Sequence, residues 1–292
     1  MQIIKKIAKK NCMGVHKLIL FFLRVIFKNT TIHKIQLKKH KENLNKKNSG
    51  NWMEFSTINE SSLHKELKNL YCLKYNGKTE VSCEGHVYDI LTKDNNVIEI
   101  QTKNLRQLLP KIDDALEKGH KVTVVHPVVI TKTIKTYNLE NKCISSKKSP
   151  KKGHIYDLFR ELTGIFPVLL NKNFTLEIPE INIIETREKK GEKVQTLQKS
   201  RRYKRDWIKT DKKLDSINSV IKFTCKKDYI NLLPCGLAQE FCAKDINNLL
   251  IKDSNIPKRL AYSGNLILWV LLRMEVIKET QKKGRTKYYC VN

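Results

Sequence analysis

The sequence predicts an α/β domain with a mixed sheet flanked by helices, followed by a small α+β domain. Between residues 60 and 190, short β-branched runs alternate with helical patterns, which is typical of strands joined by crossover helices. After a basic stretch near residue 200, three helical segments precede two strands. A chain of 292 residues, 40% of them hydrophobic, can supply a core for each of two modest domains.

Each element of the first domain follows from its local pattern. The first helix has Leu63 and Leu67 at helical spacing, and a polar turn at 93–96 between two strand-like runs indicates a hairpin. Gly119 ends a second helix, and the β-branched strand after it implies a crossover to a parallel pair. The expected elements are, in order, a helix at 59–71, strands at 86–91 and 97–102, a helix at 104–118, strands at 121–125 and 133–137, a helix at 155–163, and a strand from 174 toward 184.

The pattern breaks at residues 187–213, which hold twelve basic and four acidic side chains with little apolar periodicity. Tyr203 and Trp207 lie among the basic residues of this stretch, a mixture that suits contacts with phosphates together with stacking on bases. A solvated connector between the domains is an equally good interpretation of the stretch. Beyond this stretch, helices are expected at 228–233, 243–250 and 257–273, and strands at 276–280 and 286–291. The predicted divisions are a basic arm at 1–52, a first domain at 53–190, a basic linker at 191–224 and a second domain at 225–292.

Residues 1–52 are predicted to be a disordered basic arm. The first 50 residues hold thirteen Lys or Arg and one acid, Glu42, around an apolar stretch at 18–27. That stretch is too short to span a bilayer and is interrupted by Arg24, so stable membrane insertion is not expected. A basic amphipathic surface helix and a true start at Met53 are the open alternatives.

The overall charge and the cysteines bound the function class. A net charge of +28 favours polyanion partners, chiefly nucleic acid and then anionic membrane. The chain is also rich in Lys, Asn and Ile, as proteins from AT-rich genomes are, and the lysines of such a composition would raise the charge by themselves. The eight cysteines include no pair with the Cys-x-x-Cys spacing of a zinc clip. Scattered cysteines favour buried thiols in a reducing compartment, and a cytoplasmic location is expected.

Polar residues in the expected hairpin indicate a catalytic site. Alternate residues of a strand share a face, so Glu99, Gln101 and, if the strand persists, Lys103 project the same way. Asp89 on the partner strand can meet them, and two converging carboxylates suit a hard cation, Mg²⁺ or Mn²⁺, that acts on a phosphodiester. An amide or ammonium nearby would orient water or hold a phosphate oxygen. The alternative is that Asp89 and Glu99 are ordinary exposed carboxylates of an amphipathic hairpin. His126, at the end of another strand, is a further candidate for a catalytic residue.

This arrangement resembles the PD-(D/E)XK nuclease superfamily over roughly residues 60–130. The resemblance implies a helix, a hairpin that carries the acids, a crossover helix and a parallel strand. It also implies that Asp89 and Glu99 are the two acids and that Glu66, on the preceding helix, is a third metal ligand. Gln101 stands where the family usually has lysine, and its amide lacks the ammonium charge. Lys103, two residues on, is the candidate for the missing amine.

Residues 225–292 resemble the winged helix-turn-helix domains of DNA-binding proteins, because three helices precede a hairpin with a basic, glycine-containing tip. The resemblance implies that the helix at 257–273 is the recognition helix and that the wing carries Lys282, Lys283, Arg285 and Lys287. Trp269 and its apolar neighbours are expected in the core. With the basic stretch, the candidate nucleic-acid contacts are Arg201, Arg202, Arg205, Lys258, Arg259, Lys282, Lys283 and Arg285.

The two resemblances imply a metal-dependent endonuclease that hydrolyses phosphodiester bonds, with DNA, rather than RNA, held by the winged helix. The alternative is a non-catalytic DNA-binding or regulatory protein with a degenerate nuclease fold, which Gln101 favours. A third interpretation is a membrane-associated protein anchored through residues 1–30. No dimer face is marked in the sequence, and a homodimer stays open.

Overall fold

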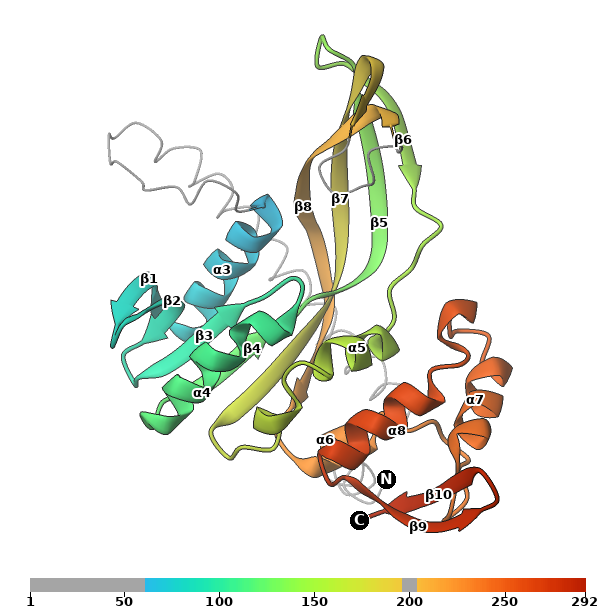
Figure 1. Cartoon of the computed structure of the whole chain (residues 1–292). Helices are drawn as coiled ribbons and strands as arrows, with labels where there is room; N and C mark the ends of the chain where they lie inside the picture. The colour runs from blue at the N-terminus through green and yellow to red at the C-terminus, as the bar shows by residue number, and fades with distance from the viewer. Residues whose placement is uncertain (1–60, 196–203) are drawn as a thin grey trace, which may run out of the picture. The chain divides into compact units, whose positions relative to one another are not determined.

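The computed structural model describes residues 61–195 and 204–292. An eight-stranded mixed sheet is flanked by helices, and a two-stranded sheet lies near the C-terminus (Figure 1), which confirms the predicted fold class at this level. The elements of the first part are α3 (Ser62–Tyr75), β1 (Gly77–Cys83), β2 (His86–Thr92), β3 (Asn96–Ile100), η1 (Leu105–Leu108), α4 (Leu109–Glu117), β4 (Lys121–Val125), β5 (Val128–Tyr137), β6 (Cys143–Lys148), η2 (Ile155–Asp157), α5 (Leu158–Leu162), η3 (Phe166–Val168), β7 (Phe174–Gln195) and β8 (Lys204–Phe223). The C-terminal elements are α6 (Lys226–Ile230), α7 (Ala243–Lys252), η4 (Lys258–Leu260), α8 (Gly264–Arg273), β9 (Ile277–Lys283) and β10 (Thr286–Val291).

The large sheet has the order β1-β2-β3-β4-β7-β5-β6, with β8 paired to β7. Its first three strands form an antiparallel meander, and α4 then carries the chain to β4, which is parallel to β3. The predicted hairpin and crossover are therefore confirmed. Strands β4 and β5 follow each other along one edge of β7, while β8 runs antiparallel along the other edge.

Two apolar clusters cover the two faces of the sheet. The smaller cluster joins Leu67 of α3 to Ile98 of β3, whereas the larger one contains the adjacent strand residue, Val97, and packs beneath α4 and α5. The larger cluster continues into the C-terminal helices, where it includes Ile267 and Val270. The two predicted domains thus share one apolar cluster.

A buried carboxylate ties α3 to the sheet. Glu177 of β7 has a fully buried side chain that pairs with Lys74 Nζ at 2.7 Å and Lys222 Nζ at 2.9 Å. The Tyr75 hydroxyl donates a hydrogen bond to the same carboxylate. These three partners outweigh the cost of burial and lower the pKa of Glu177 to about 2.

The prediction of a linker at 191–224 is wrong. β7 continues to Gln195, and β8 fills most of the remaining stretch as the partner of β7. Leu214 and Ile217 of β8 pack against the smaller apolar cluster, but half of the strand's other residues are charged or polar and exposed. The basic side chains therefore obscure the alternation by which a half-buried strand is recognised.

Strands β1 and β6 have no counterpart in the prediction. Both pair with a single neighbour at an edge of the sheet, and most of their residues are exposed. Edge strands carry charged and polar residues and need no apolar alternation, so their sequences resemble those of loops and do not predict a strand.

The helix predicted over 257–273 begins later than expected. α8 starts at Gly264, and Lys258–Leu260 form a separate 3₁₀ turn. Trp269, expected in the core, is 41% exposed, with its ring set edge-on to Phe166 at 5.6 Å between ring centroids. The leading end of the expected recognition helix therefore lies at Gly264 rather than at Pro257.

Gly264 allows α8 to approach α7 closely. A Cβ there would lie 2.6 Å from the Ala243 carbonyl oxygen and 2.7 Å from Asn247 Oδ1. We expect Gly264→Ala to lower the free energy of unfolding by about 1–3 kcal/mol, because the backbone of α7 must move. Urea denaturation measures the effect, with Gly191→Ala as the control, since a Cβ at Gly191 meets nothing within 4 Å. Equal stability of the two variants would contradict the close contact.

The predicted arm at residues 1–52 lies outside the described residues. Among the helices that the structure describes, none is long and apolar enough to cross a membrane. The cysteines of the described ranges are free thiols.

Candidate active site

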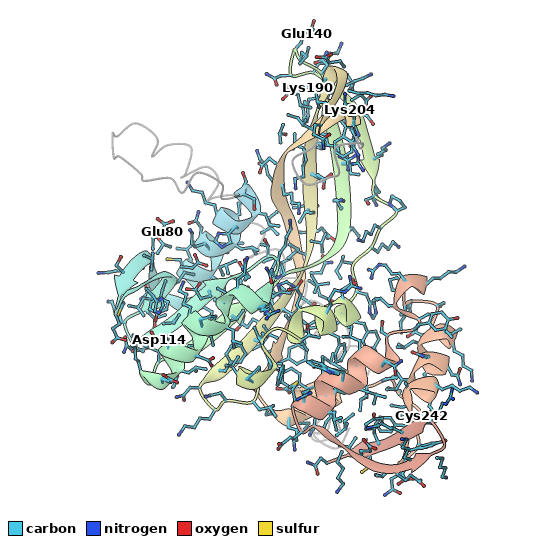
Figure 2. All side chains as sticks on the ribbon, in the orientation of Figure 1. Glu80, Asp114, Glu140, Lys190, Lys204 and Cys242 are labelled. Carbon is cyan, nitrogen blue, oxygen red and sulfur yellow. The ribbon has the colours of Figure 1, made fainter. Side chains whose placement is uncertain are left out.

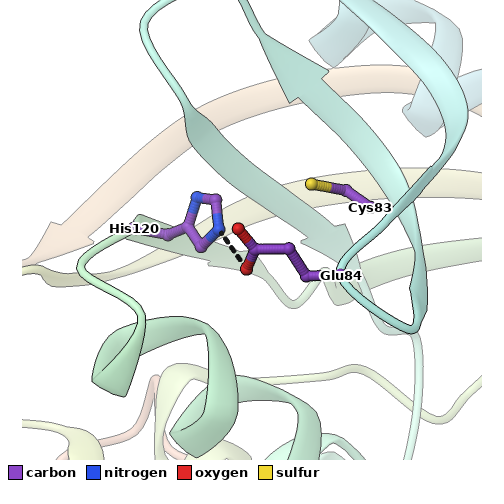
Figure 3. A group of neighbouring side chains, drawn as sticks. All are labelled: Cys83, Glu84 and His120. Carbon is purple, nitrogen blue, oxygen red and sulfur yellow. Dashed lines mark hydrogen bonds and ion pairs between the residues drawn. The ribbon is translucent and has the colours of Figure 1, made fainter.

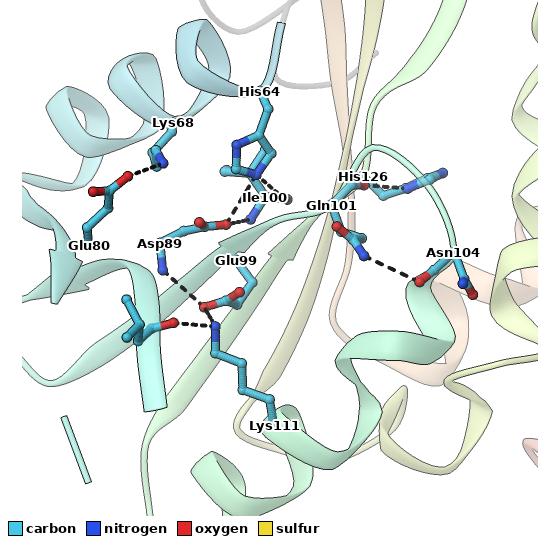
Figure 4. Close-up of polar contacts among 11 residues, drawn as sticks. His64, Lys68, Glu80, Asp89, Glu99, Ile100, Gln101, Asn104, Lys111 and His126 are labelled. Carbon is cyan, nitrogen blue, oxygen red and sulfur yellow. Dashed lines mark hydrogen bonds and ion pairs between the residues drawn. The ribbon is translucent and has the colours of Figure 1, made fainter. Parts of the chain in front are cut away.

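Asp89 and Glu99 come together where β2 and β3 separate. The ladder pairs Ile90 with Ile98, so the next position along places Asp89 opposite Glu99. At this position the backbone N–H groups donate to carboxylates instead of to carbonyl groups of the opposite strand. The Ile100 N–H donates to Asp89 Oδ2 at 2.8 Å, and the Asp89 N–H donates to Glu99 Oε1 at 3.1 Å (Figure 4). Each carboxylate is thus fixed by the backbone of the opposite strand.

A basic side chain approaches each carboxylate from a different helix. Lys111 of α4 places Nζ 2.6 Å from Glu99 Oε1 and also donates to the Val87 carbonyl oxygen at 2.6 Å. His64 of α3 places Nε2 3.5 Å from Asp89 Oδ2 and 2.6 Å from the Ile100 carbonyl oxygen. The carboxylate pair therefore lies between α3 and α4 (Figure 4).

The two carboxyl groups have pKa values shifted in opposite directions. Burial and the charge of Asp89 raise the pKa of Glu99 to about 6, although Lys111 opposes the shift. Burial would also raise the pKa of Asp89, but the hydrogen bonds from His64 and the Ile100 amide outweigh it, and the pKa is lowered. Paired titratable groups with diverging pKa values are typical of active sites.

One oxygen of each carboxylate remains available. Asp89 Oδ1 and Glu99 Oε2 make no hydrogen bond or ion pair with any residue in the described ranges. The Asp89 side chain is 20% exposed and that of Glu99 is 5% exposed, so the pair is accessible mainly from the Asp89 side. Two anchored carboxylates, each with one available oxygen, are suitable ligands for a hard divalent cation.

Glu66 does not complete a three-carboxylate site. Its Oε2 accepts a hydrogen bond from the Leu214 N–H of β8 at 2.6 Å. A set of three His, Cys, Asp or Glu side chains with all ligand atoms within 4.8 Å of one another does occur among the described residues, but it is not Glu66 with Asp89 and Glu99. The helix turns this side chain toward β8, so the prediction of Glu66 as the third metal ligand is not supported by the geometry.

Gln101 and Lys103 lie beyond the end of β3, so the condition that the strand persists is not met. The Gln101 amide group donates to the Asn104 carbonyl oxygen at 3.4 Å, away from the carboxylates (Figure 4). Lys103 is exposed in a bend. Without strand geometry, the alternation that placed both side chains beside Glu99 no longer applies.

His126 links the ends of two strands. Its Nδ1 lies 2.7 Å from the Gln101 carbonyl oxygen, and burial lowers the pKa of the imidazole. The ring also borders a pocket of about 330 Å³ at the junction of β4 and β5. The pocket includes the basic side chains of Lys132, Lys151, Lys212 and Arg259. Burial, then Lys209 and Lys103, lower the pKa of Lys212 to about 8, which indicates a concentration of positive charge.

The predicted nucleic-acid contacts on the basic stretch are only partly described. Arg201 and Arg202 lie outside the described residues. The guanidinium of Arg205 lies 4.5 Å from the centroid of the Trp207 ring, and that of Arg187 lies 3.6 Å from it. These arginines are therefore held in place on β7 and β8.

The predicted contacts in the C-terminal part divide into two groups. Arg259 forms a bidentate ion pair with Asp157 and donates to the Lys152 carbonyl oxygen at 2.7 Å, so it ties η4 to the α/β part. Exposed side chains make up the second group, which consists of Lys258, Lys282, Lys283 and Arg285. The last three lie at the turn of the β9–β10 hairpin, where the wing is expected.

Two residues beside the carboxylates, His64 and Lys111, were not predicted from the sequence. His64 borders the apolar stripe of α3 and stands four residues before Lys68, so a polar pair at helical spacing was a usable signal. Lys111 gave none, because its contact with Glu99 depends on how the crossover helix packs against the sheet.

Comparison with known proteins gives a family but no activity. Residues 61–224 match the family described as "Domain of unknown function (DUF8091)", a span that runs from α3 to just beyond β8. A protein of Treponema pallidum (strain Nichols), described as uncharacterized, is 28% identical over 239 residues, which cover 81% of this chain and 87% of that protein. No solved structure matches.

Proposed function

The chain belongs to the DUF8091 family, whose description assigns no activity, and we propose from the site itself that it is a metal-dependent nuclease that hydrolyses phosphodiester bonds in DNA. The observation that carries the proposal is the Asp89–Glu99 pair, because each carboxylate is anchored by a backbone N–H and keeps one oxygen available.

The order of the elements supports the resemblance to the PD-(D/E)XK superfamily. α3, the meander β1–β3, α4 and the parallel strand β4 follow in the order that the resemblance implies. Asp89 lies on the second strand of the meander and Glu99 on the third. Both acids therefore occupy strands that correspond to those of the motif.

Asp89 and Glu99 would hold Mg²⁺ or Mn²⁺ through their available oxygens, because hard cations prefer carboxylate ligands. When bound, the cation supplies Lewis-acid stabilisation of the charge that develops on the phosphate group. The contacts of Asp89 with His64 and with the Ile100 amide outweigh burial and lower the pKa of Asp89, which favours the ionised form that can act as a ligand.

Lys111 supplies the ammonium group that Gln101 lacks. Its Nζ is 2.6 Å from Glu99, whereas Gln101 is bonded to Asn104 and Lys103 lies past the strand. From α4, this ammonium can balance the charge of the pair or hold a phosphate oxygen. The lysine function thus moves from β3 to the crossover helix.

Basic surfaces support a polyanion as the substrate. Strands β5 to β8 extend past β1–β4, and the far end of this extension carries Lys190 and Lys204 beside Glu140 (Figures 1 and 2). The exposed tip of the β9–β10 hairpin carries three further basic side chains. Three helices followed by this hairpin agree with the winged-helix order, which favours DNA.

The second candidate is a non-catalytic DNA-binding or regulatory protein. Gln101 favours it, because an amide in place of the lysine removes a charge that phosphoryl chemistry uses. The short contacts of Lys111 with Glu99 favour it as well if they persist when substrate is bound, since they occupy one of the two acids.

Cleavage of plasmid and single-stranded DNA by the full chain, with Mg²⁺, Mn²⁺ or EDTA, separates the two candidates. The nuclease proposal predicts nicking or degradation with either metal and none with EDTA. Intact substrate under every condition, with salt-sensitive DNA binding retained, would favour the regulatory protein.

Charge removal at the wing tests the mode of DNA binding. We expect the Lys282→Ala/Lys283→Ala variant to bind DNA with a slope of log affinity against log salt that is shallower by about 2, because two phosphate contacts are lost. Fluorescence anisotropy at several salt concentrations measures the slope. Lys78→Ala/Lys121→Ala removes two exposed lysines from β1 and β4 as the control. Equal slopes for the two variants would show that the wing does not contact DNA.

A further inference from the structure

A second group of ligand-type side chains lies at the turn between β1 and β2. The sulfur of Cys83, a carboxylate oxygen of Glu84 and a ring nitrogen of His120 all lie within 4.8 Å of one another (Figure 3). Cys83 ends β1, Glu84 is in the turn, and His120 directly precedes β4. Residues far apart in the sequence thus converge at one point on the molecule.

The contacts of the His120 ring place its second nitrogen, Nε2, opposite a carboxylate oxygen. Nδ1 lies 3.0 Å from the Asn95 carbonyl oxygen, which can only accept, so Nδ1 carries the proton. In a neutral ring, Nε2 then presents a lone pair toward Glu84 Oε2 at 3.3 Å. Two acceptors at this distance require either a second proton on the ring or a cation between them.

The three side chains are held on rigid backbone. The His120 side chain is buried, and the backbone N–H of His120 donates to the Ala115 carbonyl oxygen at 3.0 Å, at the end of α4. The Cys83–His86 pair closes the β1–β2 hairpin, and Glu84 in its turn has φ 51°. A site assembled from such anchored residues is organised before a ligand arrives.

The neighbouring lysine does not occupy the site. Lys118 Nζ donates to Asp114 Oδ2 at 2.6 Å and to the Glu84 backbone carbonyl oxygen at 3.1 Å, and it stays 3.9 Å from Glu84 Oε2. The Glu84 carboxylate, 46% exposed, therefore remains open to an additional ligand.

We propose that Cys83, Glu84 and His120 form a binding site for Zn²⁺ or a similar borderline transition-metal ion. Thiolate, imidazole and carboxylate together match the ligands of zinc, whereas Mg²⁺ avoids sulfur. In a tetrahedral zinc site the ligand atoms lie roughly 3.5 Å apart, so small side-chain rotations bring this group into range. The bond from Nδ1 to the Asn95 carbonyl oxygen is the outer contact that metal-binding histidines usually make. A fourth position is left to solvent.

Cobalt substitution in the full, tag-free chain tests this site directly. Co²⁺ bound to a thiolate gives a charge-transfer absorption band, which we expect at one equivalent of metal and expect Zn²⁺, but not excess Mg²⁺, to abolish. Cys83→Ser should remove the band. Glu84→Gln, a change in an exposed turn, should weaken Zn²⁺ binding roughly tenfold or more.

The matched control is Cys143→Ser, which removes an exposed thiol on β6. This variant should keep both the band and the affinity. No band in the wild-type protein, or a band that persists in Cys83→Ser, would overturn the proposal and assign the group as an imidazolium–carboxylate pair. Circular dichroism confirms that each variant is folded. The result is independent of DNA cleavage, so it stands or falls separately from the nuclease proposal.

Discussion

Asp89→Asn is expected to reduce Mg²⁺-dependent DNA cleavage by about 100-fold or more while DNA affinity changes little. Asn keeps the shape of the side chain and can still accept the hydrogen bond from the Ile100 amide. It removes the anionic ligand, and the loss of about 3 kcal/mol or more of transition-state stabilisation corresponds to that factor. Initial rates on a fluorescent oligonucleotide measure cleavage, and anisotropy measures binding.

The matched control is Asp113→Asn, an exposed carboxylate on α4. It should leave both rates and affinity at wild-type values. Cleavage that persists at the wild-type rate in Asp89→Asn would remove Asp89 from the active site. A parallel loss of binding and of folded structure would instead give Asp89 a structural role.

Glu177→Gln is expected to lower the free energy of unfolding at pH 7 by about 3 kcal/mol, because the native protein lowers the pKa of this carboxyl from 4.5 to about 2. A carboxylate with a depressed pKa in the folded state stabilises that state above the unfolded pKa. The contribution is lost as the pH falls from 4.5 through about 2. The difference in stability between wild type and Glu177→Gln should therefore be full at pH 7 and vanish near pH 2.

Urea denaturation across this pH range measures the difference. Glu117→Gln changes an exposed carboxylate on α4 and serves as the comparison. If the gap between wild type and Glu177→Gln stayed constant with pH, the contacts from Lys74, Tyr75 and Lys222 would not be what stabilises the buried charge.

The core of the fold could be predicted where the sequence carries a clear period. α3, the β2–β3 hairpin, the crossover helix and β4 each have an apolar pattern, and all four are present. β8 could not be found this way, because half of its residues are exposed and its many basic side chains interrupt the apolar alternation. The length of β7 was underestimated for the same reason, since the half beyond Ile184 is largely charged.

Only the part of the site that lies on paired strands could be predicted from the sequence. The alternation along two paired strands brings Asp89 and Glu99 together, and the structure places them opposite each other. Lys103 was extrapolated from a strand that ends at Ile100. Lys111 and His64 come from helices, and their directions depend on packing that no local pattern encodes.

A Mn²⁺ titration followed by electron paramagnetic resonance measures whether Asp89 and Glu99 hold a divalent cation. For the wild-type chain, we expect one bound Mn²⁺ that excess Mg²⁺ displaces, which separates this site from a thiolate site. Asp89→Asn should lose that Mg²⁺-sensitive binding, and Asp113→Asn should retain it. Equal Mg²⁺-sensitive Mn²⁺ binding by wild type and Asp89→Asn would show that Asp89 is not a ligand of the cation.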